Sequence, residues 1–484
     1  MKILRYIILA VLPAIAAEAF ADVSLDSCRR MALGNNKLIR MAEENLQATG
    51  YDRKAARSLY LPALDFSAAY LYTQNKTRLI SKDMMVPTQS FNSATGKFEW
   101  NILTDPSGNP ILNPDGGGYI PTEVATIPKS ALTFDTRQFF TGAVTLTQPV
   151  FMGGQIKALN EIAGYAEQAA RAGRNQVTQD VIYAVDEAYW MVVSLKAKKQ
   201  LADSFVELVD TLHYNVQMML DEGVATRSDL LTVDVRLNEA KMLQTKCDNG
   251  LTLARMALAQ ICGQPIDRVM ILDDEDNIAP RSETCPPFTY NIEDVFARRQ
   301  DLAAVRSGIS LLQSREKLAR GMMLPKLGII GAYSFGTPNV INGFSRDIKG
   351  GFSIGAALTI PIWHWGGNYN HYRATKAATN SQRLMLEDLE DKVELQVNQA
   401  KFRFQEAFKT YSMARSNMAA AESNLRNAQL AYSEGVMTAN DVILAQTGWF
   451  QANSEKIDAE IGIHLCEVYL SKVLGTLGDL PAGK

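Results

Sequence analysis

Four segments of the sequence alternate apolar with small or polar residues, the period of two that is typical of β-strands. In the first segment, Leu64, Phe66 and Tyr70 alternate with Asp65 and Ser67. Each run is about ten residues long, the pattern of a transmembrane barrel strand with lipid on one face and water on the other. Taken alone, each strand supports an ordinary amphipathic sheet in a soluble domain nearly as well as it supports a barrel strand. The predicted strands lie near residues 63–73, 140–150, 326–336 and 352–362.

Two long segments have the composition of continuous helices. Residues 155–221 and 367–433 contain no proline and are rich in Ala, Gln, Glu, Lys and Leu, which are good helix formers. At 1.5 Å per residue, each predicts a rod of roughly 100 Å, which favours a coiled-coil-like assembly. Shorter helices are expected over 25–58, 227–262 and 440–474. Two short helices stacked end to end would match one long helix.

The order of elements occurs twice because the sequence contains an internal duplication. The segment TLTQPVFMGGQ is repeated as ALTIPIWHWGGN, and Pro149 and Pro361 are separated by 361 − 149 = 212 residues. The turn EGVATRSD returns as EGVMTAND at the same spacing, so that Asp229 corresponds to Asp441. A fixed period of this kind indicates repeated architecture.

We therefore expect two structural repeats, over residues 22–262 and 291–476, joined by an equatorial linker over 263–290 and followed by a C-terminal tail over 477–484. At the start of each repeat the segment LPAL is matched by LPKL at a spacing of 263 residues, so the first repeat holds 263 − 212 = 51 extra residues. They lie between Tyr72 and Phe140 and are rich in Asn, Gly, Pro and Thr, which predicts a loop.

The first 21 residues are expected to form a secretory signal peptide. Lys2 and Arg5 precede an apolar run that ends in the A-x-A site at Ala19–Ala21. No later stretch is long and apolar enough for a transmembrane helix, so any membrane span would consist of strands. The net charge of −3 gives no argument for a nucleic-acid partner.

The five cysteines fit no metal-binding spacing. A small buried hydrophobic role is the preferred interpretation of Cys262, and a bridge from Cys262 to Cys285 across the linker is left open. The sequence preceding Cys28 faintly resembles a lipoprotein cleavage site. The four histidines are scattered, and neither a nucleophile motif nor a phosphate-binding loop is found, so we expect no enzyme activity, no metal and no cofactor.

Four strands cannot close a barrel, because a filled barrel takes about eight. An open sheet edge is not tolerated in lipid, so the chain must pool strands with other copies. Each repeated junction is expected to turn a membrane strand into a rod helix: proline ends the strand, and the glycines allow the change of direction. The junction residues are Pro149, Gly153, Gly154, Pro361, Gly366 and Gly367, and the aromatic residues expected at the membrane interface are Tyr70, Phe151, Trp363 and Trp365.

At these residues the chain resembles the TolC family of outer-membrane efflux proteins, over about residues 22–478. The resemblance rests on the junctions QPVFMGG and IPIWHWGG, the turns EGVATRSDLL and EGVMTANDVI, and the leading LP strands. It implies an α+β membrane protein, a homotrimer whose 12-stranded transmembrane β-barrel is continued by a long periplasmic α-helical coiled-coil barrel. It also implies an outer-membrane location and docking to a periplasmic adaptor (membrane fusion) protein and an inner-membrane pump of the RND or ABC type.

The resemblance also implies roles for residues at the helix tips. In the family, aspartate rings narrow the tunnel entrance, and polar links between neighbouring coiled coils hold it shut. Asp441 matches the outermost ring position, whereas Leu444 stands at the second one. Asp229 and Tyr432 match link-forming residues, but Met437 replaces the arginine partner. The alternative for both aspartates is that they cap or solvate helix starts.

Paired Gly-Val-x-Thr turns are expected to contact the adaptor. Glycine permits a helix end with positive φ, and an exposed valine offers an apolar contact. A tight helical hairpin with no partner is the alternative. The turn residues are Gly223, Val224 and Thr226 in the first repeat and Gly435, Val436 and Thr438 in the second.

Together these patterns predict a passive export channel that carries drugs or other small toxic compounds from an inner-membrane pump across the periplasm and outer membrane. The outer-membrane duct of a type I protein secretion system is an alternative in the same class. An alternative from another class is a structural periplasmic coiled-coil protein whose strands form a soluble sheet.

Overall fold

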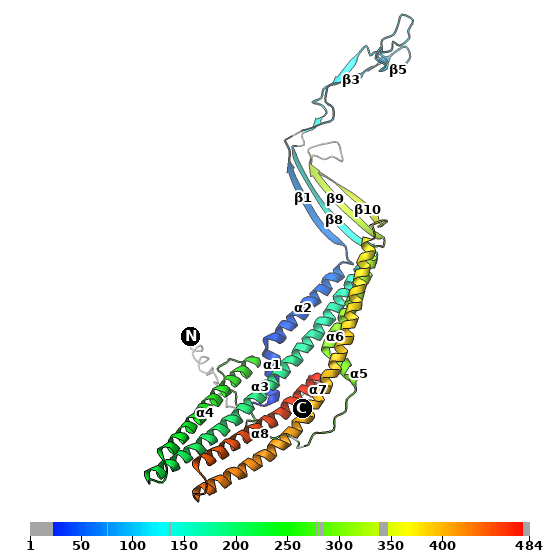
Figure 1. Ribbon diagram of the computed structural model, residues 1–484. Coiled ribbons are helices and arrows are strands. Elements are labelled where there is room, and N and C mark those ends of the chain that lie inside the picture. The colour runs from blue at the N-terminus through cyan, green and yellow to red at the C-terminus, as the bar shows by residue number, and fades with distance from the viewer. Residues whose placement is uncertain are drawn as a thin grey trace, which may run out of the picture. The chain divides into compact units, whose positions relative to one another are not determined.

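The computed structural model describes residues 23–74, 76–134, 137–275, 278–280, 282, 284–337 and 347–477 (Figure 1). It separates into two compact units. A helical unit comprises the residues up to 56 together with 157–319 and those from 367 onward, and a strand unit comprises 57–156 and 320–366. The expected signal peptide and all but the first residue of the expected C-terminal tail lie outside the described residues.

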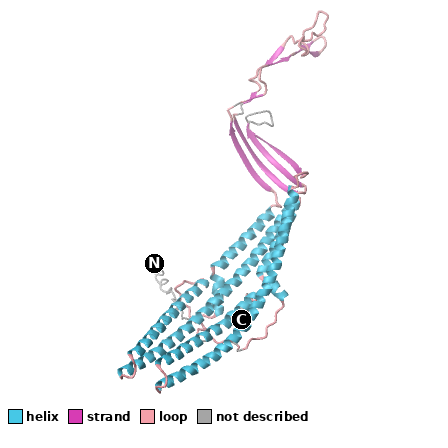
Figure 2. Ribbon diagram, in the orientation of Figure 1, coloured by secondary structure: helices cyan, strands magenta, loops and turns pink. Residues whose placement is uncertain are grey.

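The strand unit contains an antiparallel sheet, drawn in magenta in Figure 2. Its four strands have the order β1-β8-β9-β10 and are labelled in Figure 1. These strands correspond to the four segments with alternating residues. At Pro149 the expectation was wrong, because β8 continues three residues past the proline. A register shift between Pro149 and Phe151 accommodates the missing N–H as a bulge. The bounds are β1 (Ala63–Tyr72), β8 (Gln138–Met152), β9 (Lys326–Thr337) and β10 (Lys349–Thr359).

The segment between β1 and β8, predicted as a loop, contains short strands. They pair antiparallel as β2-β7, β3-β6 and β4-β5. Gly96, at φ +67°, lies in the turn that joins β4 to β5. Runs of two to four strand residues are too short to be distinguished from a loop in a segment rich in Gly and Pro. The strands are β2 (Thr77–Arg78), β3 (Met84–Pro87), β4 (Gln89–Asn92), β5 (Lys97–Trp100), β6 (Val124–Ile127) and β7 (Thr133–Phe134).

The helical unit is built on two 67-residue helices, α3 (Gln155–Asp221) and α7 (Gly367–Ser433). Each is followed by a 35-residue return helix, α4 (Arg227–Ile261) or α8 (Ala439–Val473). These four ranges agree with the sequence pattern to within one residue. Among the described residues, no helix is both long and apolar enough to cross a membrane. The shorter helices are α1 (Leu25–Asn35), α2 (Lys37–Ser58), α5 (Ile292–Arg298) and α6 (Gln300–Gly321).

The helix expected over 25–58 is interrupted at Asn36, where short helices of one repeat meet end to end. The Asn36 side chain, between α1 and α2, donates from Nδ2 to the carbonyl of Ile261 at the end of α4, at 2.9 Å. Between α5 and α6, Arg299 donates from Nη1 to the carbonyl of Val473 at the end of α8, at 3.2 Å. The two joints are related by the repeat spacings, since 299 − 36 = 263 and 473 − 261 = 212.

The first joint lies beside a core cluster formed by α1, α2, α3, α4, α8 and the linker. Tyr189 of α3 is buried in this cluster and donates its hydroxyl to Asp274 of the linker at 2.7 Å. Next to it, Arg29 of α1 donates from Nε and Nη2 to the two carboxylate oxygens of Asp186 at 2.7 and 2.6 Å. Asp186 is 0% exposed. The N-terminal helix is therefore attached to α3 through a buried ion pair.

Candidate functional site

The register of the sheet separates apolar side chains from small and polar ones. One row across the four strands holds Phe66, Val144, Tyr333 and Phe352, and the adjacent row on the other face holds Ser67, Ala143, Ser334 and Gly351. The apolar face is open in the single chain, with Phe66 66% and Phe352 72% exposed. A sheet that presents such a face along its whole length has the pattern of a membrane-spanning sheet, with lipid on the apolar face and a water-filled lumen on the other.

Both edges of this sheet are unpaired within the described residues. Strand β1 is hydrogen-bonded only to β8, and β10 only to β9. An exposed edge carries a row of backbone N–H and C=O groups that another strand can pair with. The edges therefore offer two surfaces on which a second copy of the chain could continue the ladder.

The glycines at the first strand-to-helix junction are required by the backbone. Gly153 has φ +61° and Gly154 φ +77°. A Cβ on Gly153 would lie 2.6 Å from the carbonyl oxygen of Gly321, so no other residue fits without displacement. The prediction that glycine allows the change of direction agrees with this geometry.

The second junction corrects the expectation that Gly366 and Gly367 together allow the change of direction. The positive φ values are found at Trp365, +49°, and Gly366, +74°. Gly367 is instead the first residue of α7 and has no positive φ. A spacing of 212 matches Gly153 with Trp365, because 365 − 153 = 212. The tryptophan thus adopts a left-handed conformation that costs a non-glycine residue about 1–2 kcal/mol.

The aromatic residues expected at the membrane interface all lie on the surface of the strand unit. Trp363 and Trp365 form an edge-to-face pair with ring centroids 5.9 Å apart. Amphipathic rings at strand ends are typical of the boundary between lipid and water. The four aromatic residues predicted at the interface, all of them exposed, are Tyr70, Phe151, Trp363 and Trp365.

The two helix tips have the same backbone geometry. Gly223 has φ +80°, and the next residue donates its N–H to the carbonyl of Met219 at 2.8 Å. Gly435 has φ +73°, and the next residue donates to the carbonyl of Ala431 at 2.8 Å. Glycine in the left-handed region with this bond pattern closes a helix end. Each turn leaves a valine at its apex, Val224 at 73% and Val436 at 79% exposure.

Each return helix starts with a reciprocal capping box. Oδ2 of Asp229 accepts from the N–H and hydroxyl of Thr226 at 3.0 and 2.7 Å. Oδ2 of Asp441 accepts from the same groups of Thr438 at 2.9 and 2.7 Å. These hydrogen bonds lower the pKa of both carboxyls, so both are ionised at neutral pH. Both aspartates therefore cap the starts of their helices, which was the alternative to a role at the tunnel entrance. Only one oxygen of each carboxylate takes part in the cap.

The structure brings Tyr432 of α7 close to the first helix tip. The hydroxyl lies 3.2 Å from Sδ of Met219, at the end of α3. Burial, and then the negative charge of Asp229, raise the pKa of this phenol. Tyr432 also packs on an apolar cluster that holds the two hairpins of one chain together. That cluster is formed by Val209, Leu212, Val216, Val233, Leu237, Val442 and Ile443.

One buried polar residue near the tips was not singled out from the sequence. Gln446 of α8 is 2% exposed and donates from Nε2 to the carbonyl of Leu208 on α3, at 3.1 Å. Among the described residues its Oε1 has no hydrogen-bond partner. The amide lines a small cavity of about 230 Å³ that also touches Tyr432. A glutamine within the apolar run DVILAQ is the only local signal that could have identified it.

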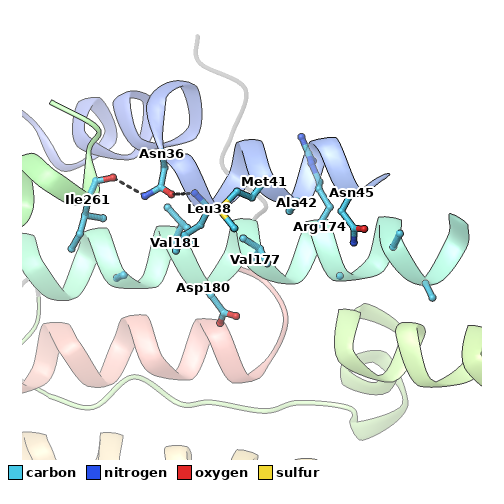
Figure 3. Close-up of a pocket in the computed structure, with 14 residues that line it drawn as sticks. Asn36, Leu38, Met41, Ala42, Asn45, Arg174, Val177, Asp180, Val181 and Ile261 are labelled. Carbon is cyan, nitrogen blue, oxygen red and sulfur yellow. Dashed lines mark hydrogen bonds between the residues drawn. The ribbon is translucent and has the colours of Figure 1, made fainter. Parts of the chain in front are cut away.

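An open apolar groove runs between α2 and α3 (Figure 3). Leu38 and Met41, on the helical face predicted from the sequence, lie at this groove with Val177 and Val181 of α3. The volume of the groove is about 720 Å³. Leu38 is 57% and Met41 66% exposed, so this face of α2 is not buried within its own chain.

The chain is similar in sequence and in fold to known proteins. A sequence profile of the family described as outer membrane efflux protein matches residues 122–264 and 291–476. Outer membrane protein TolC of Vibrio cholerae is 23% identical over 327 residues, which are 65% of this chain and 72% of TolC. The alkaline protease secretion protein AprF of Pseudomonas aeruginosa is 21% identical over 323 residues, 65% of each chain. A crystal structure of CusC has a TM-score of 0.71 at 15% identity and covers 94% of this chain and 92% of that one.

Proposed function

Since this chain belongs to the outer membrane efflux protein family, we propose that three copies of it form a passive export duct that spans the outer membrane and extends into the periplasm. The chain is an outer-membrane channel protein rather than an enzyme. Family membership also argues against a soluble periplasmic coiled coil.

The observation that carries the trimer is the four-stranded sheet with an apolar face and two unpaired edges. Backbone groups at an edge have no water to bind in lipid, so the edges must be paired. Pairing β10 of one copy with β1 of the next closes twelve strands around a lumen, and it turns the row with Phe66 and Phe352 toward lipid. The open groove on α2 and α3 supplies an apolar surface for a neighbouring copy within the helical part.

The two repeats are proposed as the structural units of the duct. Each contributes two barrel strands and one pair of coiled-coil helices, and the segment 263–290 links them at the level of the helix joints. The mature chain would begin near Asp22, after removal of the signal peptide. The duplicated joints support this division, because side chains at equivalent positions donate to equivalent backbone carbonyls in both repeats.

At the periplasmic entrance, we assign the charged ring to Asp441 and the closing contacts to Asp229 and Tyr432. The pKa values of both carboxyls are lowered, so three Asp441 side chains would place negative charge around the opening at neutral pH. Leu444 is exposed one turn further along α8, which leaves one charged ring from this motif. The exposed valines of the two Gly-Val-x-Thr turns are proposed as the contact with a periplasmic adaptor.

The proposed cargo is a drug or another small toxic compound delivered by an inner-membrane RND or ABC-type pump through that adaptor. The name of the family supports efflux. The second candidate, a duct for type I protein secretion, is supported by the similarity to AprF, a protein named for protease secretion. Deleting the gene separates the two: small-molecule efflux predicts increased sensitivity to toxic compounds, and protein secretion predicts loss of a protein from the medium.

The duct is tested with protein extracted from outer membranes in mild detergent. We expect a native mass, corrected for detergent, of three chains and discrete conductance steps in a planar lipid bilayer, because only a closed barrel holds a water-filled lumen. A mass of one chain, or release from membranes without detergent, would show that the sheet is not a barrel segment.

Replacing Asp441 with asparagine is expected to weaken block of the channel by Mg²⁺ added on the periplasmic side. The side-chain oxygen of asparagine can still accept the capping hydrogen bonds from Thr438, but the negative charge of the carboxylate is lost. Thr438→Ala is the matched control, since it removes the capping hydroxyl, at a cost of about 1 kcal/mol, and keeps the carboxylate. Single-channel currents across a Mg²⁺ titration give the measurement, and equal block in wild type and Asp441→Asn would exclude the charged ring.

A further inference from the structure

Two cysteines that are distant in sequence lie together at the first helix joint. Cys28 is on α1, and Cys262 is the C-terminal cap of α4. Both are 0% exposed and belong to the same core cluster. Sγ of Cys262 lies 3.6 Å from the carbonyl oxygen of Cys28.

The architecture of the repeat does not require sulfur at this place. In the second repeat the equivalent positions are Asn291 and Leu474, because 291 − 28 = 263 and 474 − 262 = 212. There the joint is held by Arg299, which pairs with Asp301 and donates to the carbonyl of Val473. A leucine therefore fills the position of Cys262 in the same fold, and a contacting pair of buried cysteines is a feature of the first joint alone within the described residues.

We propose that Cys28 and Cys262 form a disulfide bond in the mature protein, which fastens the N-terminal helix to the end of α4. The helical unit lies in the periplasm, where disulfides form and persist. The bond would add a covalent link beside the ion pair of Arg29 with Asp186. This proposal takes the place of the preferred interpretation of Cys262 as a small buried hydrophobic residue. The bridge from Cys262 to Cys285 that the sequence left open is not favoured, because Cys285 packs against a different core cluster.

The burial of Cys28 also argues against its use as a lipid attachment site. Lipidation would make Cys28 the first residue of the chain and remove the residues before it. Val23 forms a β-bridge with Leu272 of the linker, and Ser24 caps α1. These contacts belong to a chain that continues in front of Cys28.

The oxidant is a disulfide of the thiol–disulfide oxidoreductase class, and the exchange is balanced. Before α1 packs, both thiols are accessible, and the Cys262 thiolate attacks the oxidant first. Its sulfur bonds to one sulfur of the oxidant, whose other sulfur leaves as a thiolate. The Cys28 thiolate then attacks Cys262 and displaces the oxidant. Two electrons reduce the oxidant to a dithiol, which takes up the two thiol protons, before α1 packs and encloses the pair.

Peptide mapping of the protein from outer membranes is the direct test. Free thiols are alkylated in denaturant immediately after lysis, and the protein is digested without reduction. We expect a linked peptide that contains Cys28 and Cys262, lighter than the two separate peptides by two hydrogens. Cys247→Ser, a change at a half-buried cysteine on α4 outside the pair, should leave this peptide unchanged. Alkylation of both Cys28 and Cys262 in most molecules would overturn the proposal.

A second measurement tests the effect of the disulfide bond on the stability of the protein. The bond would close a loop of 262 − 28 = 234 residues and so restrict the unfolded chain. Dithiothreitol is expected to lower the urea midpoint of wild type and to leave that of the Cys28→Ser/Cys262→Ser double variant unchanged. A wild-type midpoint that does not respond to the reductant would contradict the bond, whatever the channel exports.

Discussion

Replacing Arg29 with alanine is expected to lower the free energy of unfolding by about 3–5 kcal/mol, because it leaves a buried carboxylate without its cation. Asp186 is 0% exposed and receives two hydrogen bonds from Arg29, at 2.7 and 2.6 Å. No water can replace the guanidinium at a fully buried oxygen without opening the contact between α1 and α3. The measurement is the urea midpoint of detergent-solubilised protein.

The stability of the Arg29→Ala variant should also depend on pH more strongly than that of the wild type, with a defined sign. Burial raises the pKa of Asp186, and Arg29 opposes that rise, so removing Arg29 raises this pKa further. The folded variant then holds a proton that the unfolded chain releases, and its stability increases as pH falls through the raised pKa. Above the raised pKa of Asp186, the variant shows its full loss of stability. The loss becomes smaller as the pH falls toward the pKa that Asp186 has in the unfolded chain. Urea titrations between neutral pH and about pH 5 follow the change.

Two matched variants separate this effect from ordinary loss of an ion pair. Arg53→Ala breaks a pair with Glu167 in which the arginine is half exposed, and it should cost about 1 kcal/mol or less. Arg29→Met combined with Asp186→Leu removes both charges and should recover most of the loss. If Arg29→Ala costs no more than Arg53→Ala, the buried carboxylate is not the cause.

The regular elements could be predicted because their determinants are local. The long helices need only the absence of proline and a run of helix formers, and α3 and α7 occupy the predicted ranges. The break at Asn36 depends on the carbonyl of Ile261, which is 225 residues away. Likewise, the bulge after Pro149 depends on pairing with β9. Such contacts leave no local pattern in the sequence.

Residues of the candidate site also divide into those with a local sequence signal and those that depend on distant contacts. Asp229 and Asp441 correspond to each other by the repeat spacing, and the resemblance to the family singled them out as site residues. The threonine three residues before each could have identified the capping boxes as well. The contact between Cys28 and Cys262 could not be deduced, because five cysteines allow many pairings. The sequence also does not indicate which helix ends are adjacent in the fold. The left-handed Trp365 was missed because glycine was expected to carry the whole turn.

Adjacent residues of β1 give the most direct test of which sheet face meets lipid. Phe66 and Ser67 lie near the middle of the strand, opposite Val144 and Ala143, and point to opposite faces. Phe66→Arg places a charge on the apolar face, where arginine near the bilayer midplane costs about 2–4 kcal/mol per chain. Because the proposed barrel contains three copies, we expect strong loss of the heat-modifiable oligomer from outer membranes.

Ser67→Arg is the matched control, since it introduces the same side chain one residue further along the same strand. On the small polar face the guanidinium would remain in water, so the oligomer should form in normal amounts. Three added positive charges in the lumen should shift ion selectivity toward anions in bilayer recordings. If Ser67→Arg abolished the oligomer while Phe66→Arg preserved it, the apolar face would have to point inward. A water-filled export duct through this sheet would then be excluded.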